Sequence, residues 1–271
     1  MDEKQLKTLL IDTFNTVSGE YDNKALRFFP DSARNMTRLL KLHGNEQVLD
    51  VACGTGNTSV AIAPLLPTGR VTAVDFSPGM LAQARQKAAA MGLNNIEFIE
   101  QDMQDLGFPE NRFDIAVCAF GIFFVSDMES QLAHISAKVK QGGRIMISNF
   151  QENYFSPLKE LFFDRIADYG VPSPPQTWRR IAHEQGCREL FQKAGLTDVH
   201  VETRNVGYVL DSAEDWWSIV WNAGLRRMVS RLSPEDQERF KREHLREIEA
   251  QRTENGIWLD VGVLYTIGTK P

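Results

Sequence analysis

The sequence predicts an α/β protein with a doubly wound, mostly parallel sheet. Three observations predict it: apolar runs of strand length recur through residues 48–150, glycine turns or polar tips follow them, and helical segments separate them. At 271 residues the chain is long enough to bury a substantial core. We therefore expect a single domain, 1–271, with helical additions.

The first strand and its turn carry the most information. Val48–Val51 has the composition of a buried parallel strand, and Gly54 and Gly56 follow it. Glycine lets the backbone turn sharply and approach a ligand with no Cβ between them. A helix expected from Asn57 would direct free N–H groups toward that ligand. A strand, a glycine turn and a helix predict a nucleotide-type site.

Two residues indicate which ligand this site takes. A dinucleotide fingerprint has a third glycine, and here that position is Ser59. Asp50 lies on the strand itself, where it would repel a pyrophosphate but attract an ammonium or a sulfonium. S-adenosylmethionine (SAM) carries both cations. An NAD-dependent oxidoreductase is the less favoured alternative.

The second strand, Arg70–Asp75, ends in a carboxylate that suits a ribose diol, because one carboxylate accepts from two hydroxyls. A helix from Pro78 to Met91 should follow. Phe76 and Met80 fall where an adenine would lie, although helix packing explains them equally well.

Strands three and four are predicted at 96–100 and 113–120. Asp102, after strand three, could accept a hydrogen bond from the adenine amino group, and the Met103 N–H could bind a ring nitrogen. An isolated aspartate in a loop is more often a turn residue. Ligands gather at the carboxyl ends of strands in such sheets, which favours the functional interpretation.

Five segments, in this order and spacing, resemble the class I SAM-dependent methyltransferases, and within them the ubiquinone/menaquinone biosynthesis C-methyltransferases (methyltransferase type 11/25). They are Val48-Leu-Asp-Val-Ala-Cys-Gly-Thr-Gly56, Val74-Asp-Phe-Ser-Pro-Gly-Met-Leu81, Gln101-Asp-Met103, Ala119-Phe-Gly121 and Val139-Lys-Gln-Gly-Gly-Arg-Ile145. The resemblance implies a Rossmann-like seven-stranded sheet, with strand seven antiparallel. It also implies that Asp50, Thr55 and Gly56 cradle the methionine end of SAM, Asp75 holds the ribose, and Asp102 with Met103 brackets the adenine.

The full set of predicted cofactor-binding residues is Asp50, Ala52, Gly54, Thr55, Gly56, Asp75, Phe76, Met80, Asp102, Met103, Ala119 and Phe120. Ala119 departs from the family pattern, since quinone enzymes often carry serine there. That departure argues against a quinone acceptor.

The pattern predicts four regions along the chain. They are an N-terminal helical lid at 1–36, a SAM-binding core at 37–150, a loop and helix on the substrate side at 151–197, and a helical insertion at 211–256 between strand six (198–210) and strand seven (257–267). In the third region, Asn149–Pro175 reads as an extended loop that ends in the stiff run Val171–Pro175.

The expected reaction is methyl transfer to a small-molecule acceptor by in-line displacement, in an apolar capped pocket. Tyr21, Phe123, Trp217 and Trp221 are candidate pocket residues, and core packing is the alternative for each. A sulfonium methyl is already activated, so positioning governs its transfer and no metal is required. No catalytic base is assigned. His183 and Tyr21 are weak candidates, and a non-catalytic SAM-binding protein would share every cofactor residue.

Composition limits the partners. A net charge of −6 and a pI near 5.5 argue against nucleic acid. Cys53, Cys118 and Cys187 are widely spaced and odd in number, which favours a reducing compartment. The longest uncharged apolar run, 115–125, is too short to span a bilayer, and no apolar signal segment is visible. A cytoplasmic location is expected, and the oligomeric state is not predicted.

Overall fold

The computed structural model of the protein describes residues 3–173 and 176–271. Contact clustering separates the chain into two compact units. The first unit comprises Met1–Phe28, Asn153–Gln176 and Asn205–Gly262, and the second comprises Phe29–Glu152, Thr177–Arg204 and Val263–Pro271. Pro174 and Pro175, part of the predicted stiff run, lie outside the described residues.

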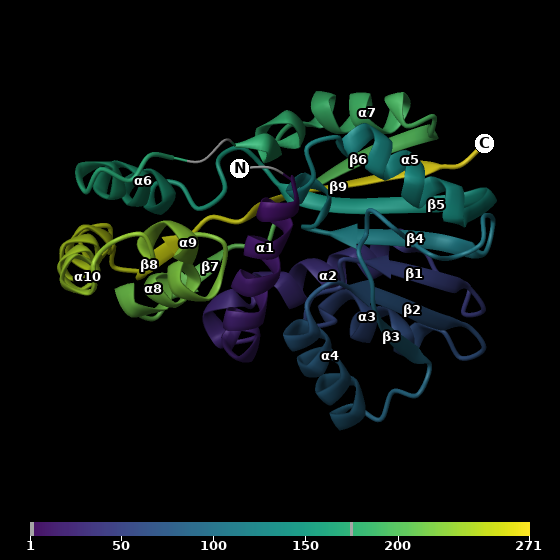
Figure 1. Ribbon diagram of the computed structural model, residues 1–271, viewed down its shortest axis with the longest axis horizontal. Coiled ribbons are helices and arrows are strands. Elements are labelled where there is room, and N and C mark those ends of the chain that lie inside the picture. The colour runs from purple at the N-terminus through teal and green to yellow at the C-terminus, as the bar shows by residue number, and fades with distance from the viewer. Residues whose placement is uncertain (1–2, 174–175) are drawn as a thin grey trace. The chain divides into compact units, whose positions relative to one another are not determined.

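The second unit is built on a seven-stranded sheet with the order β3-β2-β1-β4-β5-β9-β6 (Figure 1). Its strands are β1 (Gln47–Val51), β2 (Arg70–Asp75), β3 (Ile96–Glu100), β4 (Phe113–Ala119), β5 (Val139–Phe150), β6 (Thr197–Asn205) and β9 (Gly262–Thr269). The pairs among β1 to β5 are parallel, whereas β9 runs antiparallel to β5. The predicted fold class is confirmed.

Helices cover both faces of this sheet. They are α2 (Phe28–Leu40), α3 (Asn57–Ile62), α4 (Pro78–Ala90), α5 (Met128–Lys138) and α7 (Glu184–Lys193), with the 3-10 helices η3 (Ala63–Leu65), η4 (Ile122–Phe124) and η5 (Thr177–Ile181). Apolar residues of α5 and α7 share one cluster with Leu49 and Val51 of β1. Asp50, pointing to the opposite face by strand alternation, bonds to Ser59 of α3.

Local signals explain why these elements begin and end where they do. Ser77 accepts a hydrogen bond from the Met80 N–H and caps α4, and Pro78 occupies its first turn. Gly92, after α4, and Gly195, after α7, have positive φ values of 68° and 80°. Val48 and Leu49 are fully buried, which contributes about 1.5–3 kcal/mol for each side chain.

The first unit is helical apart from one hairpin. Its elements are α1 (Glu3–Val17), η1 (Ser18–Glu20), η2 (Lys24–Leu26), α6 (Leu158–Asp168), β7 (Tyr208–Leu210), α8 (Ala213–Asn222), α9 (Arg226–Val229), α10 (Pro234–Glu249) and β8 (Ile257–Leu259). Phe162 of α6 packs edge-on against Phe240 of α10, with ring centroids 5.6 Å apart. Trp216 of α8 donates to His244 of α10 at 2.8 Å, so α10 joins α6 and α8.

The structure corrects the prediction of strands six and seven as continuous strands. Each is interrupted: β6 ends at Asn205 before β7 begins, and β8 ends at Leu259 before β9 begins. β7 and β8 pair with each other in a separate two-stranded sheet. At the break, Gly207 lies so close to the Leu259 carbonyl that a Cβ would stand 2.4 Å from its oxygen. Only glycine allows this crossing.

Two helix predictions also change. The predicted loop 149–175 contains α6, whose buried Leu158, Phe162 and Ile166 recur every four residues. The predicted helical insertion 211–256 is divided at Ala223, whose extended backbone (φ −135°, ψ −161°) separates α8 from α9. Ser233 is the N-cap of α10, since its side chain accepts from the Asp236 N–H. Among the helices described, none combines the length and apolarity needed to cross a bilayer.

Candidate functional site

The carboxyl ends of β1, β2 and β4 meet at one edge of the second unit's sheet, because these strands are parallel neighbours. Asp50 lies in β1 and Asp75 is the last residue of β2. Both side chains are buried, Asp50 completely and Asp75 at 6% exposure. Burying two carboxylates at the same end of the sheet costs free energy, and a bound cation would compensate their negative charge.

Asp50 is only partly satisfied by the protein. Its Oδ2 accepts a 2.5 Å hydrogen bond from the Ser59 hydroxyl. Its Oδ1 is buried and has no hydrogen-bond partner among the residues that the structure describes. Burial, reinforced by the charge of Asp75, raises the pKa of Asp50 to about 7, although the Ser59 hydroxyl opposes the shift. The free oxygen is a ready acceptor for an ammonium group.

Asp75 ties the glycine turn to the start of α4. Its Oδ2 accepts from the Gly54 N–H at 2.8 Å, and its Oδ1 accepts from the Ser77 N–H at 2.9 Å. Burial raises the pKa of Asp75 to about 6 against the opposing effect of these backbone donors. Each carboxylate oxygen can accept more than one hydrogen bond, so capacity is left for a hydroxyl.

The two glycines of the turn have different roles. Both have positive φ values, 54° for Gly54 and 78° for Gly56. A Cβ on Gly54 would meet no atom of the described chain within 4 Å, so this glycine borders open space. A Cβ on Gly56 would stand 3.0 Å from the Ala84 Cβ and 3.3 Å from Phe98. Gly54 thus leaves space beside the turn, whereas Gly56 permits close packing on α4.

Thr55 is buried between the two glycines. Its hydroxyl lies 3.3 Å from Asn57 Nδ2 and 3.4 Å from Lys87 Nζ, and Lys87 also donates to Asn57 Oδ1 at 2.7 Å. These contacts fasten the turn to α4 through side chains. The role predicted for Thr55 at the methionine end stays a prediction.

Three of the residues predicted near the adenine follow β2 or β3, and the fourth, Met80, lies in α4. Phe76 is half-buried, whereas Met80 is 1% exposed and faces the interior from α4. Asp102 accepts from the Gln104 N–H at 3.0 Å, which is a turn-forming contact. The Met103 carbonyl accepts from Gln131 at 2.6 Å, and its side chain packs against the core. The adenine assignment stays a prediction for all four residues.

The ends of β1 and β4 contain strained backbone. Ala52 and Phe120 have φ values of 54° and 53°, in a region that non-glycine residues rarely adopt. The Phe120 N–H donates to the Ser148 carbonyl at 2.9 Å. A Cβ on Gly121 would lie 2.9 Å from Ala52 and 2.8 Å from Cys118, so the two strand ends touch there. Strain of this kind concentrates at ligand sites.

The hydrogen-bond acceptors at the carboxyl ends of these strands fit SAM. The unpartnered Asp50 oxygen suits the ammonium, the Asp75 carboxylate suits the ribose hydroxyls, and the open side of Gly54 leaves room beside them. A dinucleotide would bring two phosphate charges toward the same buried carboxylates. Within the described ranges, no group of three metal-ligating side chains occurs.

The predicted acceptor residues divide between the units. Tyr21, Trp217 and Trp221 belong to the first unit, and all three are half-buried. Phe123 belongs to the second unit, where its ring contacts Phe124 and packs against the core. His183 is exposed, and its Nδ1 accepts from the Gly186 N–H at 3.0 Å as the N-cap of α7. That bond fixes the orientation of the ring.

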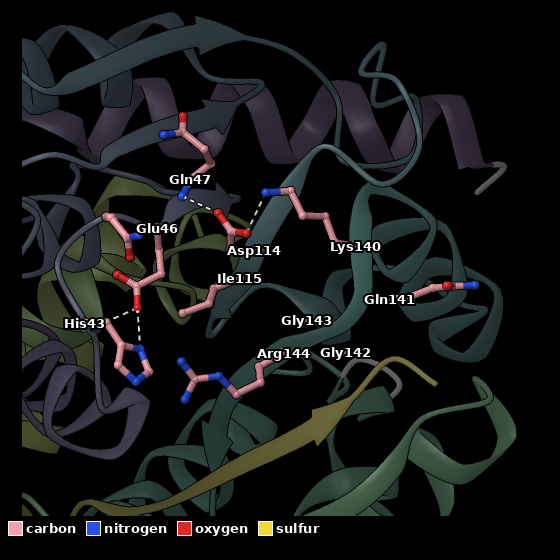
Figure 2. A pocket seen from close by; sticks show the side chains of 11 residues that line it. His43, Glu46, Gln47, Asp114, Ile115, Lys140, Gln141, Gly142, Gly143 and Arg144 are labelled. Carbon is pink, nitrogen blue, oxygen red and sulfur yellow. Dashed lines mark hydrogen bonds and ion pairs between the residues drawn. The ribbon is translucent and has the colours of Figure 1, made fainter.

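A polar pocket of about 510 Å³ lies at the opposite, amino end of β1 and β4 (Figure 2). Asp114 accepts from the Gln47 N–H at 2.8 Å and from Lys140 at 2.6 Å. Glu46 accepts from the His43 and Gly44 N–H groups at 2.7 and 2.9 Å. Burial alone would raise the pKa of Glu46, but these donors lower it. Since both carboxylates are used to fasten loops, we assign this pocket a structural role.

Sequence reasoning missed three contributors to the site. Ser59 stands where a dinucleotide fingerprint has its third glycine, and its hydroxyl also donates a hydrogen bond to Asp50. Gly121 brings the ends of β1 and β4 together, and Phe150 packs on Phe120 at 4.5 Å between ring centroids. The nine-residue separation of Asp50 and Ser59, across a turn into a helix, was the one available signal. The other contacts join distant segments and leave no local pattern.

Known proteins resemble this chain in sequence and fold. A family model described as a methyltransferase domain matches residues 48–143. Aklanonic acid methyltransferase DauC of Streptomyces sp. (strain C5) is 29% identical over 182 residues, covering 66% of this chain and 83% of that protein. A demethylmenaquinone methyltransferase of Bacillus cytotoxicus is 31% identical over 214 residues, covering 72% and 90%.

The fold is shared with solved structures. The crystal structure of a putative methyltransferase from Bacillus halodurans superimposes with a TM-score of 0.60 at 21% identity, covering 89% of this chain and 99% of that one. At this identity the likeness concerns the fold.

Proposed function

We propose a function for this protein on the basis of its family: the chain belongs to the class I SAM-dependent methyltransferases. It is accordingly a SAM-dependent methyltransferase for a small-molecule acceptor. The finer proposal is that the methyl group passes by in-line displacement to an acceptor held in an apolar pocket. SAM supplies an activated sulfonium methyl, and the residues of this chain orient it.

One observation carries the assignment of the methionine end of SAM to β1. The fully buried Asp50 keeps one carboxylate oxygen without a partner among the described residues, and a second buried carboxylate, Asp75, shares its edge. A cationic ligand neutralises this pair and satisfies the oxygen. We propose that Asp50 receives the ammonium of SAM and that Asp75 receives the ribose hydroxyls.

Positioning is the expected source of rate enhancement. Holding two reactants in line can lower a barrier by about 7–11 kcal/mol. We assign no general base. His183 is the N-cap of α7, and its Nδ1 already accepts from the Gly186 N–H. Tyr21 stays a weak candidate for orienting the acceptor.

Isotope transfer tests this function directly. The protein is incubated with methyl-labelled SAM and a pool of small metabolites, and labelled products and S-adenosylhomocysteine are followed by mass spectrometry. We expect both to appear together. Binding of SAM with no S-adenosylhomocysteine formed would favour the non-catalytic alternative. Calorimetry with NAD provides the second contrast, since NAD binding equal to SAM binding would favour an oxidoreductase.

A further inference from the structure

Helix α5 attaches the chain segment 103–108, which follows β3, to the rest of the second unit. Three side chains of α5 make this attachment, and their spacing of three and four residues places them on one face of the helix. They are Gln131, His134 and Lys138, and we call them the α5 clamp. Gln131 Nε2 donates to the Met103 carbonyl at 2.6 Å, the Leu106 N–H donates to His134 Nε2 at 3.1 Å, and Lys138 Nζ donates to the Phe108 carbonyl at 3.0 Å.

The clamped segment adjoins the two residues proposed to bracket the adenine, Asp102 and Met103. The turn that contains them has bonds of its own. The Gln104 N–H donates to Asp102 Oδ1, and the Asp105 N–H donates to the Asp102 carbonyl, both at 3.0 Å. These bonds shape the turn, whereas the α5 clamp ties it to a helix packed on the sheet. The position of the Met103 backbone therefore depends on side chains of α5.

His134 can hold Leu106 only while its Nε2 carries no proton. A ring nitrogen that accepts a hydrogen bond presents a lone pair, and protonation of the imidazole turns both ring nitrogens into donors. Two N–H groups would then face each other across 3.1 Å. Burial, reinforced by the charge of Lys138 on the same helix, lowers the pKa of His134, while Asp105 in the clamped segment opposes the shift. The ring is therefore neutral at pH 7 and becomes charged only in more acidic solution.

The α5 clamp links the protonation of one histidine to the shape of the cofactor site. Resting on the proposed function, we propose that Gln131 and His134 are positioning residues for the adenine of SAM, and that protonation of His134 weakens cofactor binding. A segment that loses one of its three attachments is less ordered before the ligand arrives, and ordering it on binding lowers the affinity. This pH dependence acts on the adenine part of the ligand, separately from Asp50 and Asp75.

Calorimetry of adenosine and S-adenosylhomocysteine from pH 8 to pH 5 tests this inference, because adenosine lacks the methionine part. His134→Gln places an amide oxygen near the position of Nε2, and an amide is not protonated in this range. At pH 8 this variant should bind both ligands within about twofold of the parent, and at pH 5 about threefold more tightly than the parent. His134→Leu removes the acceptor, so it should bind about three- to tenfold more weakly than the parent at pH 8 and approach the parent at pH 5. Asp50 and Asp75 are unchanged in both variants, so the difference between profiles isolates His134.

His200→Gln is the matched control, because His200 is exposed on β6 of the same unit, and this variant should reproduce the profile of the parent. Gln131→Leu keeps the titrating ring, so it should weaken adenosine binding about three- to tenfold at pH 8 and leave the pH dependence in place. Parallel profiles for the parent and His134→Gln, with either ligand, would overturn the inference. Should His134→Leu unfold in a thermal melt, the comparison of His134→Gln with the parent still decides. A parent that binds no S-adenosylhomocysteine at any pH would instead contradict the proposed function.

Discussion

At the scale of single residues, Asp75 is the carboxylate on which cofactor affinity should depend most. It holds the glycine turn through Gly54 and is proposed to accept from the ribose. Asp75→Ala should therefore lower SAM affinity at least tenfold, from the loss of about 1.5–3 kcal/mol of charge-assisted hydrogen bonding. Asp114→Ala is the control, since Asp114 accepts a backbone N–H at the other end of the sheet. Calorimetry that finds the same loss in both variants would assign Asp75 to folding alone.

The two buried carboxylates also predict a pH dependence. The pKa values of Asp50 and Asp75, about 7 and about 6, lie above the 3.8 of a free aspartate. Between pH 4 and pH 7 the folded protein therefore binds protons that the unfolded chain has released. By linkage, the contribution of these groups to the free energy of unfolding falls as pH rises through this window and is constant above it.

Cofactor binding should respond in the opposite direction. The cations of SAM prefer ionised carboxylates, so SAM affinity measured by calorimetry should rise from pH 5.5 to pH 8. Adenosine lacks the methionine part and should show a shallower rise. Asp50→Asn should flatten the difference between the two ligands. Parallel pH profiles for SAM and adenosine in the parent protein would argue against contact between Asp50 and the ammonium.

At the scale of elements, the link between α8 and α10 is a buried hydrogen bond. Trp216 and His244 are both 0% exposed, and the indole N–H donates to His244 Nε2. Burial lowers the pKa of His244 to about 4, so its ring is neutral near pH 7. Trp216→Phe leaves the buried nitrogen without its donor and should cost about 1–3 kcal/mol in urea unfolding. Trp258→Phe, at a side chain 49% exposed, should change stability by less than about 0.5 kcal/mol.

Two other tryptophans of α8, Trp217 and Trp221, are only half-buried, unlike Trp216. Trp217 and Trp221 stack with centroids 5.9 Å apart, and the Arg226 guanidinium lies 4.3 Å from the Trp221 centroid. Since both indoles are half-buried, the prediction that they belong to the acceptor pocket stays open to test. Trp217→Ala and Trp221→Ala should raise the acceptor KM while SAM affinity stays within a few fold. A loss of about 3–5 kcal/mol of stability with unchanged KM would show that they are core.

At the scale of the whole molecule, the proposed cofactor residues all belong to the second unit, although the chain passes through the first unit three times. A ligand at a hundredfold excess over its Kd should stabilise the state that binds it by about 2.7 kcal/mol. Hydrogen exchange with S-adenosylhomocysteine should therefore slow most in 50–57, 75–80, 102–103 and 119–121. The predicted N-terminal lid requires added protection in 18–22 as well. Protection absent from the glycine turn would contradict the site.

Much of the cofactor half could be predicted from the sequence because its signals are local. The strand Arg70–Asp75 has the predicted bounds and the next helix begins at Pro78 as predicted, and each signal depends on residues within one turn or one strand. Asp50 and Asp75 could be placed at neighbouring strand ends because adjacent parallel strands must end at one edge. The family resemblance implied the seven-stranded sheet with its antiparallel strand seven, and the strand order came from the structure.

Only the tertiary structure decided what joins distant segments. Phe29 and Phe120 are in contact although they stand 91 positions apart in the sequence. No periodic pattern in the sequence predicts this contact. Strands six and seven are interrupted where the backbone at Gly207 lies against the Leu259 carbonyl. Strand propensity does not predict this contact, because it depends only on neighbouring residues. The sequence by itself determined strands one to four, the helix after strand two and the positions of the two carboxylates, since those follow from neighbouring residues and alternation. Packing decided which side chains remain partly open beside them, because burial depends on every segment that folds over a given position.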